Sequence, residues 1–98
     1  MTTSEKRIYH MAIVAEVRDI ISNHKDACSR IFLYNFDNST TLTTPYTKGF
    51  RRMTKKLISE TLEAFSHAIY RLAKNGHKEE AEKITDIQVR YNKFFGRI

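Results

Sequence analysis

Five basic residues fall within nine positions of the chain, and no acidic residue lies among them: Lys48, Arg51, Arg52, Lys55 and Lys56. We expect them in the first turns of a long helix, where the helix dipole makes cations unfavourable. A sequence selected only for stability would carry Asp or Glu there. The placement therefore indicates a use, in which these cations and the free backbone N–H groups attract an anion such as phosphate. The alternative is a solvated face whose charges only avoid the core.

A second group of candidate binding residues lies near the C-terminus, where basic and aromatic residues alternate. The basic ones are Arg90, Lys93 and Arg97. Such residues can follow a nucleic-acid backbone while neighbouring rings stack on the bases. The interpretation we prefer is that Tyr91 and Phe94 belong to the core and that Phe95 covers an edge.

The residues needed for catalysis or metal binding are present, but their spacing is unsuitable. No two of the four histidines are three or four positions apart, so we expect them at the surface or partly buried. Cys28 could act as a nucleophile beside His24, but no third group orients that histidine. The three glycines are isolated, so there is no phosphate-binding loop. We therefore predict neither enzymatic activity nor a metal or cofactor.

The composition is that of one small globular domain, covering residues 1–98. A chain that is 41% hydrophobic and 29% charged is expected to fold rather than stay disordered. With one cysteine it forms no intrachain disulfide, which favours a cytoplasmic location. The longest nearly uncharged apolar run, Met11–Ala15, is far too short to span a membrane. We also find no secretory signal at the N-terminus.

The positive charge is confined to one half of the chain. Residues 1–47 carry five basic and five acidic residues, whereas residues 48–98 carry twelve and six, which accounts for the whole net charge of +6. This asymmetry points to an anionic partner. A charge that serves only solubility is the alternative.

Apolar spacing predicts the first helix and leaves the next segment ambiguous. Thr2 and Glu5 have the spacing of a capping box, and two apolar stripes follow, so we expect this helix to have neighbours on two sides. We predict a short helix from about Asp26 to Asn35, although Ile31–Phe36 would also suit a strand. Asp37–Thr44 has the composition of a loop.

The strongest pattern predicts a long helix from Pro45 to Lys74, roughly 45 Å in length, with Thr44 as its N-cap. Asn75-Gly76 ends it, since glycine readily takes the left-handed conformation. A last helix runs from about Lys78 to Phe95. The short link forces these two helices into an antiparallel hairpin.

The turn of this hairpin, with Leu72-Ala73, Gly76 and Glu80-Ala81, resembles the turn region of tetratricopeptide-type repeats. The resemblance covers roughly 20 residues and has no second copy, whereas such arrays need about three repeats. It implies a helical hairpin rather than a repeat array.

We predict an all-α fold, a three- to four-helix bundle built on the hairpin of about 45–74 and 78–95. The expected core residues are Val17, Ile21, Met53, Leu57, Leu62, Phe65, Ile69, Leu72, Ile84, Ile87 and Tyr91. The chain has eleven aromatic residues, and its first helix is apolar nearly all round. Together they present more apolar surface than such a bundle easily covers. A homodimer or a larger complex would cover the excess, and burial in the core alone is the alternative.

Three functional hypotheses follow. We prefer a small non-enzymatic protein that docks as an inhibitor or accessory subunit on a larger, nucleic-acid-handling complex, as phage-type regulators of this size often do. The second hypothesis is a basic protein that contacts the phosphates of DNA or RNA, for which no base-reading module is present. The third is a cytoplasmic immunity-type helical bundle.

Overall fold

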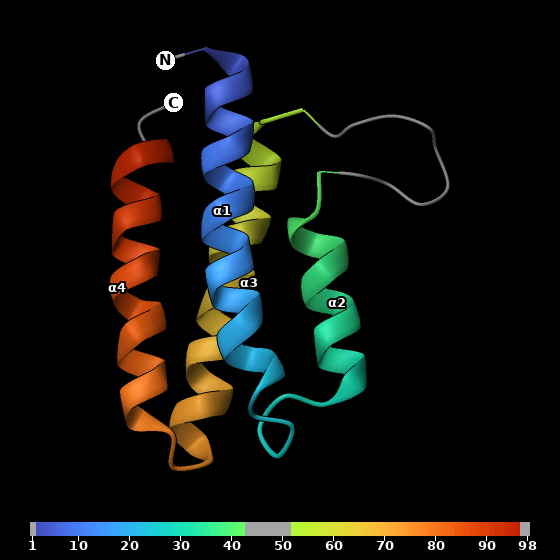
Figure 1. The fold of residues 1–98 in the computed structure, drawn as a ribbon, viewed down its shortest axis with the longest axis vertical. Helices are drawn as coiled ribbons and strands as arrows, with labels where there is room; N and C mark the ends of the chain where they lie inside the picture. Colours follow the sequence, from blue (N-terminus) through green and yellow to red (C-terminus); the bar gives the residue numbers. More distant parts are fainter. Residues whose placement is uncertain (1, 43–51, 97–98) are drawn as a thin grey trace.

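The computed structural model describes residues 2–42 and 52–96, which form four α-helices and, within those ranges, no strand. The helices are α1 (Thr3–Ser22), α2 (Arg30–Thr40), α3 (Lys55–Lys74) and α4 (Lys78–Phe95). They run side by side along the long axis of the molecule (Figure 1). The predicted all-α helical bundle is therefore confirmed. In the part of the chain that the structure describes, no helix is long and apolar enough to cross a membrane.

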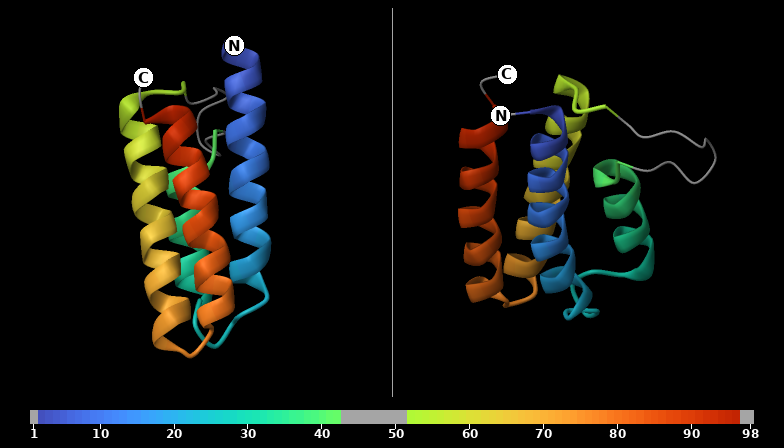
Figure 2. Two further views of the ribbon diagram at one scale, coloured as in Figure 1. Left: turned by 90° about the vertical axis from the view of Figure 1, so that its left-hand side faces the viewer. Right: turned by 45° about the horizontal axis from the view of Figure 1, so that its top comes forward.

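The two most extensively packed helices, α3 and α4, form the predicted antiparallel hairpin (Figure 2). Gly76 takes the positive φ of 85° that this turn requires. The N–H of His77 donates to Leu72 O at 2.8 Å, and the N–H of Gly76 donates to Ala73 O at 3.2 Å. These two bonds are those of a Schellman motif, which satisfies carbonyls at the end of α3.

One hydrophobic core takes side chains from all four helices. Helix α1 contacts each of the other three, and in Figure 1 it lies between α4 and α2. Eight of the eleven predicted core residues are buried, and Met53, Leu62 and Ile69 are partly buried against the core.

The predicted start of the long helix is wrong. Residues 52–54 are not helical, and Thr54 is the N-cap of α3, with its side chain accepting a hydrogen bond from the N–H of Leu57 at 3.1 Å. Helix α3 has 20 residues, which corresponds to about 30 Å rather than 45 Å. The proposed N-cap Thr44 and first residue Pro45 lie outside the described residues.

The prediction for α2 is right in type and wrong in its bounds. Ile31–Phe36 is helical, which excludes the strand. The helix starts after Ser29, whose hydroxyl accepts from the N–H of Phe32, and it continues through Asp37–Thr40, where we predicted a loop. The polar side chains there find partners without leaving the helix, as when Thr40 Oγ1 donates to Phe36 O at 2.8 Å.

Candidate functional site

One face of α1 is apolar and exposed. Ile8 and Met11 are 67% and 56% exposed, and Ala12 and Ala15 are also exposed. Their spacing of three or four residues places them on one stripe of the helix. The opposite stripe, which includes Ile13, is buried in the core. Of the two apolar stripes that the sequence predicts for this helix, the fold thus covers only one. We refer to Ile8, Met11, Ala12 and Ala15 as the α1 outer face.

A groove of about 230 Å³ lies between α1 and α2 beside this face. Met11 and Ala15 line it and also belong to the α1 outer face, so the two surfaces are continuous. Val14 and Leu42 add further apolar lining. The groove therefore extends an exposed apolar face into a concave site that an apolar side chain could fill.

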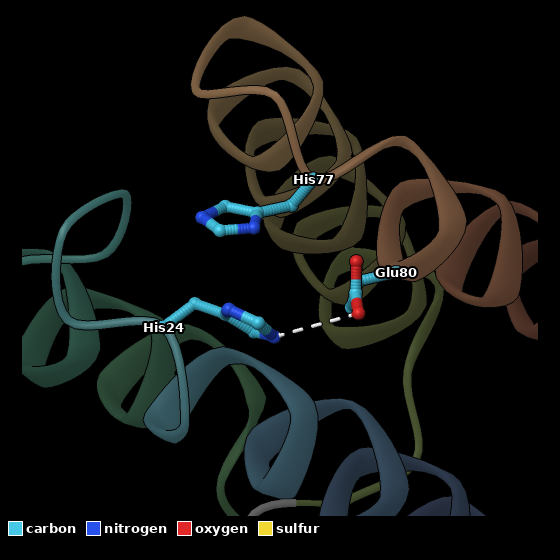
Figure 3. Close-up of side chains that lie close together, drawn as sticks. All are labelled: His24, His77 and Glu80. Carbon is cyan, nitrogen blue, oxygen red and sulfur yellow. Dashed lines mark ion pairs between the residues drawn. The ribbon is translucent and has the colours of Figure 1, made fainter.

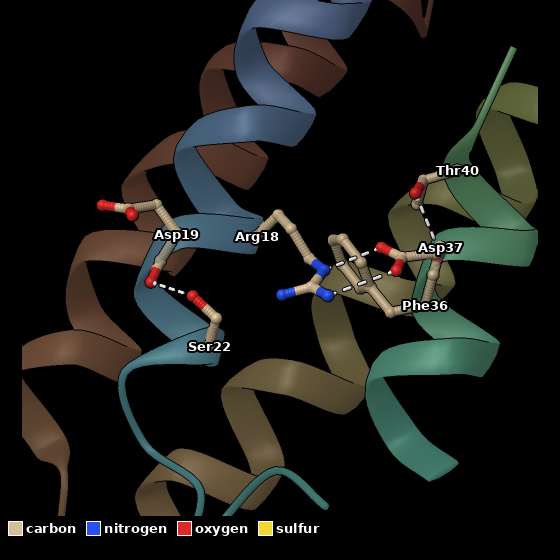
Figure 4. A network of polar contacts seen from close by, with 6 residues as sticks. All are labelled: Arg18, Asp19, Ser22, Phe36, Asp37 and Thr40. Atoms are coloured by element: carbon tan, nitrogen blue, oxygen red, sulfur yellow. Dashed lines mark hydrogen bonds and ion pairs between the residues drawn. The ribbon is translucent and has the colours of Figure 1, made fainter. Parts of the chain in front are cut away.

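An ion pair joins the two helices at this groove. Arg18 Nε donates to Asp37 Oδ1 at 2.8 Å, and Arg18 Nη2 donates to Asp37 Oδ2 at 3.3 Å, a two-pronged contact between α1 and α2 (Figure 4). Both side chains also line the groove. This geometry fixes the distance between the groove walls more firmly than a single-bonded pair would.

A buried polar network lies under the same region. His10 is fully buried, so the expectation of histidines at the surface or partly buried is wrong for this residue. Its Nε2 lies 2.7 Å from Thr40 O, and its Nδ1 lies 2.8 Å from the Tyr91 hydroxyl. Because a carbonyl only accepts, Nε2 carries a hydrogen and Nδ1 can accept from Tyr91. Burial raises the pKa of Tyr91 to about 12, against a smaller lowering by a hydrogen bond with Thr61. The phenol therefore remains a donor at neutral pH.

The predicted basic residues that the structure describes are all exposed. Arg52 precedes α3, and Lys55 and Lys56 form its first turn. Arg90 and Lys93 lie in the last turns of α4. Lys48, Arg51 and Arg97 lie outside the described residues.

The hairpin brings these two groups to one end of the molecule. The start of α3 and the end of α4 lie at the same end, and the first turns of α1, with Lys6 and Arg7, reach it too (Figures 1 and 2). We refer to Arg52, Lys55, Lys56, Arg90 and Lys93, together with Lys6 and Arg7, as the basic end. Part of its charge is balanced, because Arg90 Nη2 pairs with Glu16 Oε2 at 3.1 Å and Lys56 Nζ lies 4.0 Å from Glu60 Oε1.

The preferred interpretation of the aromatic residues near the C-terminus is confirmed for Tyr91, whereas Phe94 and Phe95 exchange the places we expected. Tyr91 and Phe95 are fully or almost fully buried. Phe94 is half-buried against Tyr9, with ring centroids 4.2 Å apart. Burial removes the rings of Tyr91 and Phe95 from any stacking on nucleic-acid bases.

Cys28 is buried, and burial raises the pKa of its thiol. A nucleophilic cysteine requires the opposite, an accessible thiolate with a lowered pKa. A pairing of Cys28 with His24 is therefore unsuited to nucleophilic catalysis. His24 instead faces Glu80 and His77, a contact that spacing along the chain did not indicate.

No protein-family model, curated protein or solved structure matches this chain. The resemblance of the hairpin turn to tetratricopeptide-type repeats remains a local one.

Proposed function

We propose that this protein is a non-enzymatic binding protein that docks through the α1 outer face onto a larger protein, as an inhibitor or accessory subunit. The observation that carries the proposal is the exposure of Ile8 and Met11 on a helix whose opposite stripe is buried. Neighbouring apolar side chains left in water cost free energy, which a partner recovers by covering them.

The groove gives this docking surface a means of selecting its partner. Interfaces draw most of their affinity from a few large side chains that fill pockets near the centre. The groove between α1 and α2 is concave, mostly apolar and continuous with the exposed stripe. Arg18 and Asp37 at its wall add charged groups for orientation. We expect the partner to insert a Leu, Met or aromatic side chain beside Met11.

We consider two roles for the basic end. In the first, it steers the protein toward an acidic patch near the docking site of the partner, which raises the association rate more than the affinity. In the second, it contacts nucleic-acid phosphates directly, and this is the second candidate function. The observation that favours the second candidate is the gathering of three helix termini with basic residues at one end. Among the described residues, no contact favours the immunity-type hypothesis in particular.

The test uses a photo-crosslinking amino acid at position 11 of the full-length protein, expressed in its native cells. We expect crosslinks to one protein from position 11 and none to that protein from position 82, an exposed site in α4. With that partner purified, Met11→Glu should weaken binding by about tenfold or more, because a charge would enter an apolar interface.

The matched control is Tyr70→Glu, which places the same charge at an apolar residue of α3 that is 64% exposed. It should bind like the wild type. Equal binding by Met11→Glu and the wild type would contradict the proposal, as would crosslinking that does not depend on position. Sedimentation of the purified chain distinguishes a second copy of itself as the partner from a different protein.

A further inference from the structure

Three side chains from distant parts of the sequence converge at the end of the molecule opposite the basic end. His24 follows α1, His77 is the N-cap of α4, and Glu80 lies in the first turn of α4. Figure 3 shows the two imidazole rings and the carboxylate facing a shared space. One potential ligand atom from each residue can be chosen so that all three lie within 4.8 Å of one another. His24 Nε2 lies 3.9 Å from Glu80 Oε1, and the ring centroids of the histidines are 4.3 Å apart.

The backbone holds these residues in place independently of their side chains. The N–H of His24 donates to Ile21 O, and its carbonyl accepts from Ala27 and Cys28 at 3.1 and 2.9 Å. His77 is held by the Schellman motif and by its carbonyl, which accepts from the N–H of Ala81 at 3.0 Å. Both histidines are therefore anchored at fixed turns rather than on free loops.

The residue at the N-cap of α4 is unexpected for a helix start. Ser, Thr, Asp and Asn are preferred at this position because their side chains bond to free N–H groups. His77 makes no side-chain capping bond. Its ring turns instead toward His24 and Asp26. Helix capping thus gives no reason for a histidine here, whereas its contacts with Asp26 and His24 do.

A carboxylate orients the ring of His77. His77 Nε2 lies 2.7 Å from Asp26 Oδ2, and an ionised carboxylate can only accept. In the neutral imidazole, Nε2 is thus the nitrogen that carries the hydrogen, and the lone pair is on Nδ1, the ring nitrogen on the side of Glu80 in Figure 3. A histidine that binds a metal usually donates its other N–H to a carboxylate or carbonyl in this way.

We propose that His24, His77 and Glu80 bind a divalent transition-metal ion of the zinc type, with Asp26 as the hydrogen-bond partner that orients His77. Two imidazole nitrogens and one carboxylate oxygen suit zinc and its neighbours, whereas magnesium and calcium require mostly oxygen ligands. Tetrahedral zinc needs ligand atoms about 3.3 Å apart. Movements of about 1 Å, within the reach of partly exposed side chains, bring these atoms to that spacing. A fourth position stays open to water or to a ligand from a partner.

The bound ion would connect two segments that otherwise meet through side chains alone, the turn after α1 and the turn before α4. It would therefore stabilise the folded chain in addition to the core, because an ion that binds only the native state shifts unfolding by mass action. This site does not depend on the docking function proposed above.

The test is calorimetric titration of the full-length protein, after removal of any affinity tag, with Zn²⁺ and separately with Mg²⁺. We expect one Zn²⁺ per chain with a dissociation constant in the micromolar range or tighter, and no heat from Mg²⁺. Co²⁺ should give the visible absorption of a tetrahedral or five-coordinate site with nitrogen ligands. Zn²⁺ should also raise the melting temperature of the wild type.

Variants then identify the ligands. Because the side chain of His77 makes no capping bond, His77→Ala should fold normally and lose Zn²⁺ binding, and Glu80→Gln should do so with almost unchanged shape. Asp26→Asn should weaken binding by about tenfold, as expected for a residue that only orients a ligand.

The matched control is His67→Ala. His67 Nε2 lies 3.6 Å from Glu63 Oε1, so it also forms a histidine–carboxylate pair, but it is outside the three-residue cluster. This variant should bind Zn²⁺ like the wild type. Absence of Zn²⁺ binding by the wild type would overturn the proposal, as would folded His77→Ala and Glu80→Gln variants that keep wild-type affinity.

Discussion

A single buried side chain, that of His10, connects three of the four described helices. Its ring joins three helices, because it lies on α1, contacts the Tyr91 hydroxyl on α4 and reaches the last carbonyl of α2 at Thr40. That carbonyl is among those that a helix end leaves without an intrahelical partner. The ring is fully buried, so no water replaces it easily. His10 therefore contributes to how α1, α2 and α4 are held relative to one another, in addition to the shared hydrophobic core.

We expect His10→Leu to lower the free energy of unfolding by about 3 kcal/mol, because it removes hydrogen-bond partners from two buried polar groups. Urea unfolding followed by circular dichroism measures the difference. His67→Leu is the control, since His67 is exposed, and it should change stability by less than about 0.5 kcal/mol. Similar losses in the two variants would show that the network around His10 contributes nothing particular.

At this scale the sequence identifies core residues better than functional ones. Apolar periodicity predicts that Phe65 and Ile84 are buried, as they are. It says nothing about His10, because a buried histidine is recognised only by the partners that other helices supply. His24 and His77 are 53 positions apart, so only the fold brings them together. The spacing of His77 and Glu80, one helical turn apart, was the one local sign of that cluster.

The four helices differ in how far their ends follow from local sequence. The start of α1 at Thr2 is as predicted, because its side chain accepts from the N–H of Glu5 at 3.1 Å. The start of α3 was misplaced because Met53 keeps the apolar spacing of the helix although residues 52–54 are not helical. Periodicity thus predicts which residues face the core, whereas the capping bond of Thr54 decides where the helix begins.

The turn between α3 and α4 provides a prediction about an element end. Gly76 has a φ of 85°, and a Cβ built there would meet no atom within 4 Å, so only backbone strain opposes substitution. Gly76→Ala should destabilise the protein by about 1–2 kcal/mol. Thermal melting measures this loss as a lowered midpoint. Gly76→Asn should cost less, because asparagine tolerates the left-handed region, and equal costs for the two would contradict the strain argument.

At the scale of the whole molecule, the antiparallel hairpin determines where the basic residues lie. The start of α3 and the end of α4 are far apart in sequence, yet the turn at Gly76 returns the chain so that Lys55, Lys56 and Lys93 lie at one end. The charge pattern along the chain identifies both basic groups, but only the hairpin brings them to one end of the molecule. The apolar spacing placed the first group inside a helix that begins later than predicted.

The second candidate function is tested by binding of labelled DNA and RNA, single- and double-stranded, at two salt concentrations. If the basic end contacts phosphates, affinity should fall steeply as salt rises, because bound counterions are released on association. Changing Arg52, Lys55 and Lys56 together to Glu should then abolish binding. Absence of binding by the wild type at low salt would exclude this candidate and leave the docking function.

The same topology suggests the order in which the chain folds. Helices α3 and α4 are joined by three residues, so their extensive contacts close only short loops. His10 instead meets Tyr91 across 81 positions, and such a distant contact costs more chain entropy to form. We expect the hairpin to form early and α1 to dock late. His24 belongs to this late-arriving part, whereas His77 and Glu80 belong to the hairpin. An ion held by all three would therefore also slow the departure of α1 from the hairpin.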